Sequence, residues 1–342
     1  MPTGKRKIHS IQFLRFVAAT LVVLFHAHLA LSKELLSSGG DKTQLYLFGF
    51  GAVGVHIFFV ISGYIMVLTN SQANRAFDAK RFFRKRIIRI YPIYWLLAAL
   101  YILVNTAIGS GYEFSLYNLI SALLLLPDNA PLIIGPAWTL SYEMYFYLMF
   151  GIAMIFGLLR GIFLLSAFFF LAMAFGVIVG PENESLAMAT NSLLIEFLFG
   201  VWIAYITGRN KLPKWLGYIS VLLSIMLFSG GLLAGYESLP SAIIWGIPSA
   251  FLIMGVVILE HYHQPAFVEK LSPLGDSSYT LYLAHILIIT LLVLITKAVS
   301  ISLLPILLLT AIFTIIAITV SHLFHLYVEA PMTNRLNKWF GS

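Results

Sequence analysis

Long apolar runs recur along the whole chain, each close to twenty residues in length. A run of about 20 apolar residues matches a helix that crosses the hydrocarbon core of a bilayer. A membrane β-barrel would instead show alternating strands of about ten residues. The pattern therefore predicts an all-α fold, a polytopic membrane helical bundle. Its predicted spans are 9–31, 45–69, 87–108, 137–159, 161–180, 189–208, 214–235, 241–260, 277–297 and 301–328.

One further apolar run, Leu116–Leu126, is too short to cross a core of about 30 Å. The basic residues decide whether it crosses. With ten spans and both termini cytoplasmic, 18 of the 21 Lys and Arg residues are cytoplasmic, and only Lys33, Lys42 and Lys297 lie outside. If the short run crossed, the split would become 12 to 9. The positive-inside rule favours the first arrangement, with residues 109–136 as an outer loop that holds the half-inserted segment 116–126.

Composition excludes a water-soluble protein. Of the 342 residues, 60% are hydrophobic and 10% are charged, where a soluble domain has about 25% charged residues. The absence of cysteine excludes disulfides, thiolate catalysis and cysteine-based metal sites. The net charge of +7 is explained by the cytoplasmic loops, so no nucleic-acid partner is predicted. We expect residues 1–342 to form a single integral-membrane domain with no attached soluble domain, its first apolar run being a retained span. The oligomeric state is left open.

The first span carries two ionisable residues inside its apolar run, Arg15 and His26. Such residues are costly in a membrane and mark functional sites. Eleven residues of helix return to nearly the same face, about 16 Å further along the axis. The span therefore presents a cation and an imidazole in one direction at two depths, with Arg15 towards the cytoplasm and His26 towards the outside.

A second cationic feature lies where the basic loop 70–90 enters the third span. Arg86 and Arg89 are three residues apart on a helix and share a face at the membrane edge. Because arginine binds phosphate through two parallel hydrogen bonds, this pair suits a phosphorylated ligand. His285, in the inner half of its span, is expected to join Arg15 and this pair.

Other ionisable residues are predicted near His26 in the outer half of the membrane. Glu143 lies about two turns into its span, and a carboxylate there can orient an imidazole. His56 has a structural and a catalytic interpretation that the sequence does not separate. Glu329 is expected to pair with Arg89 or another basic side chain. No metal site is predicted, since no carboxylate accompanies the histidine pairs at matching depth and spacing.

At these residues the chain resembles the acyltransferase-3 family of bacterial membrane O-acyltransferases, in particular its stand-alone, exopolysaccharide-acetylating branch. The matching motifs appear in family order across almost the whole chain. They are Ser10–Arg15 followed by His26, Gly54–Tyr64, Arg86–Pro92, Trp138–Glu143 and Tyr279–His285.

The resemblance implies an enzyme that transfers an acyl group, usually acetyl, from cytoplasmic acyl-CoA to a sugar hydroxyl at the outer side of the bacterial inner membrane. It also implies that His26 and Arg15 are essential and that Arg86 and Arg89 handle CoA. The acceptor would be an exopolysaccharide or a lipid-linked sugar. A transporter or flippase for a lipid-linked saccharide is the alternative, although the chain shows no internal repeats of the kind found in many transporters.

A mechanism combines these residues. The phosphates of CoA lie against Arg86 and Arg89, near Arg15 and His285, and the pantetheine arm rises towards His26. His26 acts as general base with Glu143 holding its tautomer, or it carries the acyl group itself. Residues expected along the substrate channel are His56, Ser62, Gly63 and Tyr142.

Overall fold

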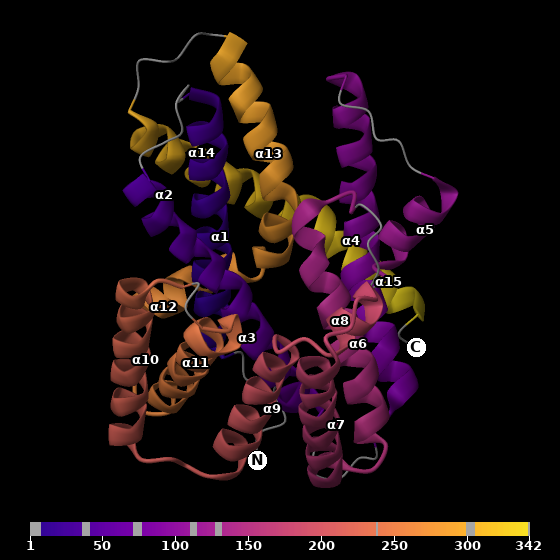
Figure 1. Cartoon of the computed structure of the whole chain (residues 1–342), viewed down its shortest axis with the longest axis vertical. Coiled ribbons are helices and arrows are strands. Elements are labelled where there is room, and N and C mark those ends of the chain that lie inside the picture. Colours follow the sequence, from indigo (N-terminus) through magenta and orange to yellow (C-terminus); the bar gives the residue numbers. More distant parts are fainter. Residues whose placement is uncertain are drawn as a thin grey trace.

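The computed structural model describes residues 8–35, 42–70, 77–109, 115–126, 132–236, 239–298 and 305–340. Within these ranges the chain forms helices and no strand (Figure 1). The helices of the first half are α1 (His9–Leu35), α2 (Lys42–Gly49), α3 (Val53–Asn70), α4 (Ala79–Ala107), α5 (Leu116–Leu124), α6 (Trp138–Met154) and α7 (Leu158–Val179). Those of the second half are α8 (Glu184–Ala189), α9 (Leu194–Arg209), α10 (Lys214–Ala234), α11 (Ile247–Glu260), α12 (Ala266–Leu271), α13 (Ser278–Ala298), α14 (Ile306–Phe324) and α15 (Ala330–Phe340). Single turns of 3₁₀-helix lie at Phe50–Ala52, Gly135–Ala137 and Ser272–Gly275, and π-helical turns at Ala242–Gly246 and His325–Glu329.

The predicted polytopic bundle is confirmed. Nine helices in the described part of the chain are long and apolar enough to cross a membrane. The remaining predicted span, 137–159, corresponds to α6, which has 17 residues and follows the 3₁₀ turn Gly135–Ala137. Outward-facing side chains are apolar, and Val177 and Ile178 of α7 are 80% and 82% exposed. Such surfaces are unfavourable in water and suited to lipid. The chain is a multi-pass membrane protein.

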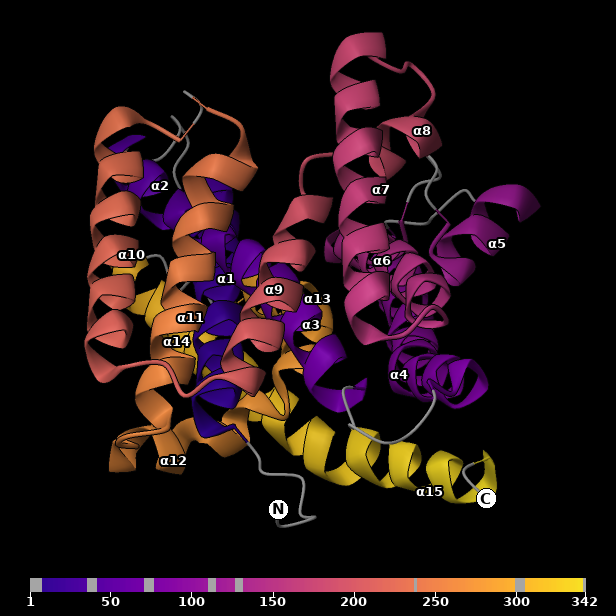
Figure 2. The ribbon, with the colours of Figure 1, turned by 90° about the horizontal axis from the view of Figure 1, so that it is seen from below.

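The helices form two groups (Figure 2). One contains α1, α3, α9, α10, α11, α13 and α14, and the other contains α4 to α7, while α15 runs across the ends of both. Within the first group α1 packs against α3, α13 and α14. The start of α1 is capped by Glu260 of α11, which accepts hydrogen bonds from the backbone N–H groups of His9 (2.9 Å) and Ser10 (3.1 Å) and from the Ser10 hydroxyl. A carboxylate at this position satisfies the free N–H groups of the helix and its dipole, so the first span is held in place.

Helix α5 corresponds to the short apolar segment and ends against the middle of α4. Tyr94 donates to the carbonyl of Ala122 (2.6 Å), Trp95 to that of Leu123 (2.9 Å), and Tyr91 to that of Leu124 (3.0 Å). The last carbonyls of a helix lack intrahelical partners, and in a membrane they must be satisfied by protein. These three donors therefore satisfy the carbonyls at the end of this nine-residue helix and fix that end against α4, as a half-inserted segment requires.

Two glycines bring α3 and α9 into backbone contact. A Cβ atom on Gly63 would lie 1.9 Å from the carbonyl oxygen of Phe197, and one on Gly200 would lie 1.9 Å from that of Val60. Gly63 was expected along a substrate channel. The structure instead places it in a helix–helix contact, because two glycines facing each other allow closer packing than any other residue.

Replacing Gly63 with alanine should therefore destabilise the protein. The added methyl group forces α3 and α9 apart, and overpacking of this kind costs about 1–3 kcal/mol. We expect a lower unfolding temperature of the purified protein in detergent. Gly208→Ala on α9 is the matched control, since nothing lies within 4 Å of its Cβ position. Equal unfolding temperatures for the two variants would contradict the packing role.

Candidate active site

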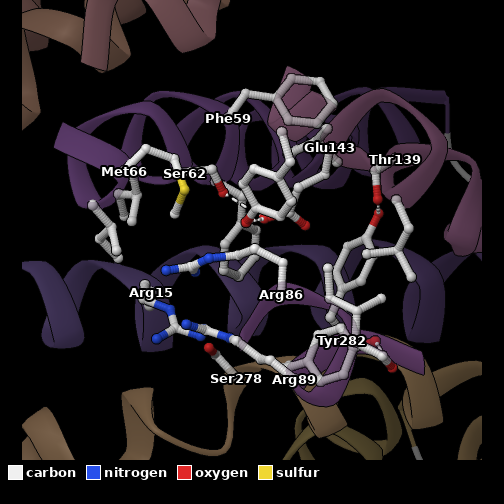
Figure 3. A pocket seen from close by; sticks show the side chains of 18 residues that line it. Arg15, Phe59, Ser62, Met66, Arg86, Arg89, Thr139, Glu143, Ser278 and Tyr282 are labelled. Carbon is white, nitrogen blue, oxygen red and sulfur yellow. Dashed lines mark hydrogen bonds between the residues drawn. The ribbon is translucent and has the colours of Figure 1, made fainter. Parts of the chain in front are cut away.

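A cavity, partly open at the surface of the molecule, lies where the two helix groups meet. It is lined by residues of α1, α3, α4, α6 and α13. The charged residues of the lining are Arg15, Arg86, Arg89 and Glu143. Figure 3 shows the three guanidinium groups gathered at one end, Thr139 and Tyr282 at the other, and Glu143 between them. The cavity thus has a cationic end and a largely uncharged end.

The arginines converge as the sequence predicts. Arg15 and Arg86 are buried, and Arg89 is half-buried. Arg15 donates to the side-chain oxygen of Gln12 (3.2 Å). The Arg86 guanidinium lies over the rings of Tyr147 (5.5 Å) and Phe82 (5.8 Å), and its buried Nε has no hydrogen-bond partner in the described structure.

None of the three arginines forms an ion pair with a carboxylate of the described residues. Three cations at one end of a cavity repel one another, and an unpaired buried charge costs several kcal/mol. An anionic ligand would relieve both costs. Because guanidinium groups bind phosphate through paired hydrogen bonds, this end of the cavity suits a molecule with several phosphate groups.

Glu143 does not hold His26, contrary to the sequence prediction. Its Oε1 accepts hydrogen bonds from the hydroxyl of Ser62 (2.9 Å) and from that of Tyr147. Tyr147 lies one turn further along α6, and residues four apart on a helix are neighbours. Ser62 reaches the same oxygen from α3. Glu143 therefore belongs to the cavity with the arginines, and Ser62 lines the cavity beside it.

His26 instead contacts His285 of α13. The two rings have centroids 4.9 Å apart, and Nε2 of His285 lies 3.3 Å from Nδ1 of His26. His285 is fully buried. It was expected beside the arginines, and the structure corrects this. Ser278, Tyr279 and Tyr282 of α13 line the cavity, but one turn further the helix lies against α1 at the depth of His26.

Tyr282 separates the cavity from this histidine pair. Its hydroxyl donates to the carbonyl of Pro136 (3.0 Å) and accepts from Thr139 (3.0 Å). Its ring packs edge-on against Phe58 (5.7 Å between centroids) and lies 6.0 Å from the ring of His285. His26 and His285 are not among the residues that line the cavity. Sequence reasoning did not single out Tyr282. An uncharged tyrosine in a membrane helix lacks the large desolvation cost that identifies charged residues as functional candidates.

His56 pairs with Glu196, a residue that sequence reasoning missed. Nδ1 of His56 lies 2.7 Å from Oε1 of Glu196, which is fully buried on α9. Oε2 of Glu196 has no hydrogen-bond partner in the described residues. The cost of a carboxylate inside an apolar span, which drew attention to Glu143, would also have identified Glu196.

Removing His56 should destabilise the protein strongly. His56→Leu leaves the Glu196 carboxylate buried without a partner, and breaking a buried pair from one side costs about 3–5 kcal/mol. We expect poor recovery of folded protein and a lower unfolding temperature in detergent. The double variant His56→Leu, Glu196→Gln should recover much of the loss, because no buried charge remains. If the single variant is as stable as wild type, the pair is not structural.

Two further predicted residues have clear surroundings. Tyr142 packs between the rings of Trp138 (5.7 Å) and Phe59 (6.1 Å) and does not line the cavity. Glu329 accepts hydrogen bonds from Thr280 (2.6 Å) and His325 (2.7 Å), and not from Arg89 as expected. Among the described residues no three His, Asp or Glu side chains are grouped to hold a metal ion.

Comparison with known proteins decides the family. The model of the acyltransferase-3 family, which describes an acyltransferase domain, matches residues 8–326 of this chain. The chain belongs to the acyltransferase-3 family.

Three relatives of known name are similar to this chain over different shares of their length. The exopolysaccharide production protein ExoZ of Rhizobium meliloti is 28% identical over 73% of this chain and 80% of its own length. The acyltransferase MdmB of Streptomyces mycarofaciens is 28% identical over 44% of this chain and 40% of its own. The peptidoglycan O-acetyltransferase OatA of Listeria monocytogenes is 23% identical over 84% of this chain and 50% of its own. No solved structure matches the chain.

The family membership makes this chain an enzyme, an acyltransferase, and the acetyltransferase relatives support O-acetyl transfer. The arginine cavity and the histidine pair, which belong to five of its helices, are thus the two parts of the molecule where acyl-transfer chemistry is to be sought.

Proposed function

We propose that this acyltransferase moves an acetyl group from cytoplasmic acetyl-CoA, or another acyl-CoA, to a saccharide hydroxyl at the outer side of the bacterial inner membrane. An exopolysaccharide or a lipid-linked sugar is the acceptor class. The observation that carries the proposal is the cavity whose one end holds Arg15, Arg86 and Arg89 without a carboxylate partner among the described residues.

The donor is proposed from the charge of that end. CoA carries a diphosphate and a 3′-phosphate, and the arginines offer donors in the geometry that phosphate prefers. Arg86 lies against Phe82 and Tyr147, and its Nε has no hydrogen-bond partner in the part of the chain that the structure describes. The pantetheine arm would then extend through the uncharged part of the cavity to Phe58 and Tyr282. Tyr282 would have to move aside for the thioester to reach His26.

The sides of the membrane are proposed from charge distribution. By the positive-inside rule, the basic residues around α4 and the arginine end of the cavity would lie at the cytoplasmic side of the membrane. Arg15 and His26 lie on one helix about 16 Å apart along its axis. A donor held at the Arg15 level therefore presents its thioester nearer the outer side, where the saccharide is available. Both termini would be cytoplasmic.

The proposed chemistry at His26 is general base catalysis. Nε2 of His26 takes the proton of the acceptor hydroxyl as its oxygen attacks the thioester carbonyl carbon. The carbon–sulfur bond then breaks, and the CoA thiolate leaves and takes up that proton. In the rival course His26 attacks first and passes the acetyl group to the hydroxyl in a second step. Both courses use the same two histidines and the same cavity.

A transfer assay with the purified protein tests the proposal. Protein reconstituted in liposomes would receive acetyl-CoA labelled in the acetyl group, together with saccharides from cells that lack this protein. We expect labelled ester on the saccharide and one equivalent of free CoA for each ester formed. Saccharide movement across the bilayer without consumption of acetyl-CoA would instead indicate a transporter or flippase. If the folded wild-type protein forms no labelled ester and moves no saccharide, acyl-CoA is rejected as the donor.

A further inference from the structure

We propose that His285 is the positioning residue of His26, accepting a hydrogen bond from its Nδ1–H and stabilising the ring when it becomes positively charged. The proposal rests on the proposed function of His26 as the group that takes a proton or an acyl group. It replaces the roles that the sequence indicated, a carboxylate partner for His26 and CoA binding by His285, with a pair of imidazoles.

The hydrogen bonds of the two rings define where their protons lie. Nδ1 of His26 is 2.9 Å from the carbonyl oxygen of Val22, and Nδ1 of His285 is 3.2 Å from that of Leu281. A carbonyl oxygen only accepts, so each Nδ1 carries a hydrogen. In a neutral imidazole the other nitrogen then has a lone pair. Both rings are held by the carbonyl one turn earlier in their own helix, which orients each ring independently of the other.

This assignment makes the contact between the rings a directed hydrogen bond. Nε2 of His285, with its lone pair, lies 3.3 Å from the N–H at Nδ1 of His26. The hydrogen at Nδ1 of His26 is therefore shared between Val22 and His285. Nε2 of His26 is left with a lone pair and has no hydrogen-bond partner among the described residues. It is the nitrogen available for the acceptor hydroxyl or the acyl group.

The same geometry stabilises His26 when it becomes positively charged. After Nε2 takes a proton or an acetyl group, the N–H at Nδ1 becomes a charged donor, and hydrogen bonds from charged donors are stronger. His285 can accept this bond without adding a charge of its own. In a Ser-His-Asp triad a buried aspartate supplies this acceptor. Here Glu143, the carboxylate that the sequence indicated, is committed to Ser62 and Tyr147.

Because His285 is buried, it can act on the reaction only through His26. Its side chain is fully buried, its two nitrogens are both accounted for, and it does not line the arginine cavity. It therefore contacts neither the proposed phosphate site nor the acceptor. A residue that acts through His26 should change the rate of transfer and leave the binding of CoA unchanged.

Kinetics of two substitutions test the role. His285→Leu removes the acceptor, whereas His285→Gln places an amide oxygen near the position of Nε2. We expect kcat of His285→Leu to fall on the order of 100-fold, at the lower end of general-base contributions, with an unchanged KM for acetyl-CoA. His285→Gln should recover a substantial part of kcat. His28→Leu is the matched control, a buried histidine on α1 that contacts Thr310 and Phe48 instead, and its kcat should stay close to wild type.

The outcomes separate the possible roles. A raised KM for acetyl-CoA with unchanged kcat would overturn the proposal in favour of CoA binding. Equal loss in His285→Gln and His285→Leu, with equally lowered unfolding temperatures, would show a merely structural residue and also overturn it.

A spectroscopic measurement tests the pair without reference to activity. Nitrogen-15 NMR of the full-length protein in bilayers, labelled at histidine, distinguishes a protonated ring nitrogen from one with a lone pair. The two residues are assigned by difference from His26→Ala and His285→Leu. We expect unprotonated Nε2 atoms on both neutral rings, and a protonated Nε2 on either would overturn the proposal. If the tautomers are as expected but wild type transfers nothing from acetyl-CoA, the proposed function fails and the pairing of the histidines stands.

Discussion

Replacing His26 with alanine should abolish acyl transfer while leaving the protein folded and able to bind acyl-CoA. Nε2 of His26 has no hydrogen-bond partner among the described residues, and its loss removes either the base or the acyl carrier. A positioned general base contributes about 10²–10⁴-fold to a rate, and a lost covalent carrier would cost more. The side chain is not part of the arginine cavity, so the affinity for CoA should be close to that of wild type. Transfer of labelled acetyl groups and CoA binding in detergent measure the two quantities.

The control for this experiment is His28→Ala. His28 lies two residues further along the same helix, is buried, and stacks on Phe48 (4.0 Å between centroids). His28→Ala also removes a buried imidazole, but one with no role in the proposed chemistry. A change seen in both variants therefore reports on folding. Normal transfer by His26→Ala would contradict the assignment. Loss of CoA binding in that variant alone would place His26 in the donor site instead.

The arginine end of the cavity was predictable from the sequence because charge and depth define it. Arg15 is costly within an apolar span, and Arg86 and Arg89 share a helix face at the point where a span begins. Few places in a membrane bundle can hold three such cations, so their convergence follows from topology. The bundle itself was predictable for the same reason, since the length and polarity of apolar runs decide which segments cross.

The pairings between side chains were not predictable, because they depend on the rotation of each helix. Glu143 and His26 have similar depths, and depth was the only coordinate that the sequence supplied. The structure shows that Glu143 faces Ser62 and Tyr147, whereas His26 faces His285. Depth alone likewise placed His285 with the arginines.

Close contacts between helices set these rotations. A Cβ atom on Gly54 of α3 would lie 2.2 Å from the carbonyl oxygen of Ala18 on α1, and the contact of Gly63 with Phe197 joins α3 to α9. The sequence showed that these glycines permit close packing, but it did not show which helix each would contact. Glu196 illustrates the same limit, since its partner His56 lies 140 residues away along the chain.

Replacing both Arg86 and Arg89 with alanine should weaken the binding of acetyl-CoA by two or more orders of magnitude. Hydrogen bonds to charged groups contribute about 1.5–3 kcal/mol each, and about 1.4 kcal/mol corresponds to a tenfold change in affinity. Arg86 and Arg89 each offer several donors to the cavity. The effect should appear as a raised Kd for CoA in detergent and should shrink at high salt, since screening weakens the interaction in wild type.

Two comparisons make this prediction specific to phosphate. Acetyl-pantetheine, which lacks the nucleotide and its phosphates, should bind equally weakly to wild type and to the double variant, because it offers nothing to the arginines. Arg81→Ala is the matched control, since Arg81 lies on the same helix, is exposed and does not line the cavity. If the double variant still prefers acetyl-CoA over acetyl-pantetheine as strongly as wild type does, the phosphates bind elsewhere. The three arginines, which have no carboxylate partner among the described residues, would then require another anion to offset their mutual repulsion.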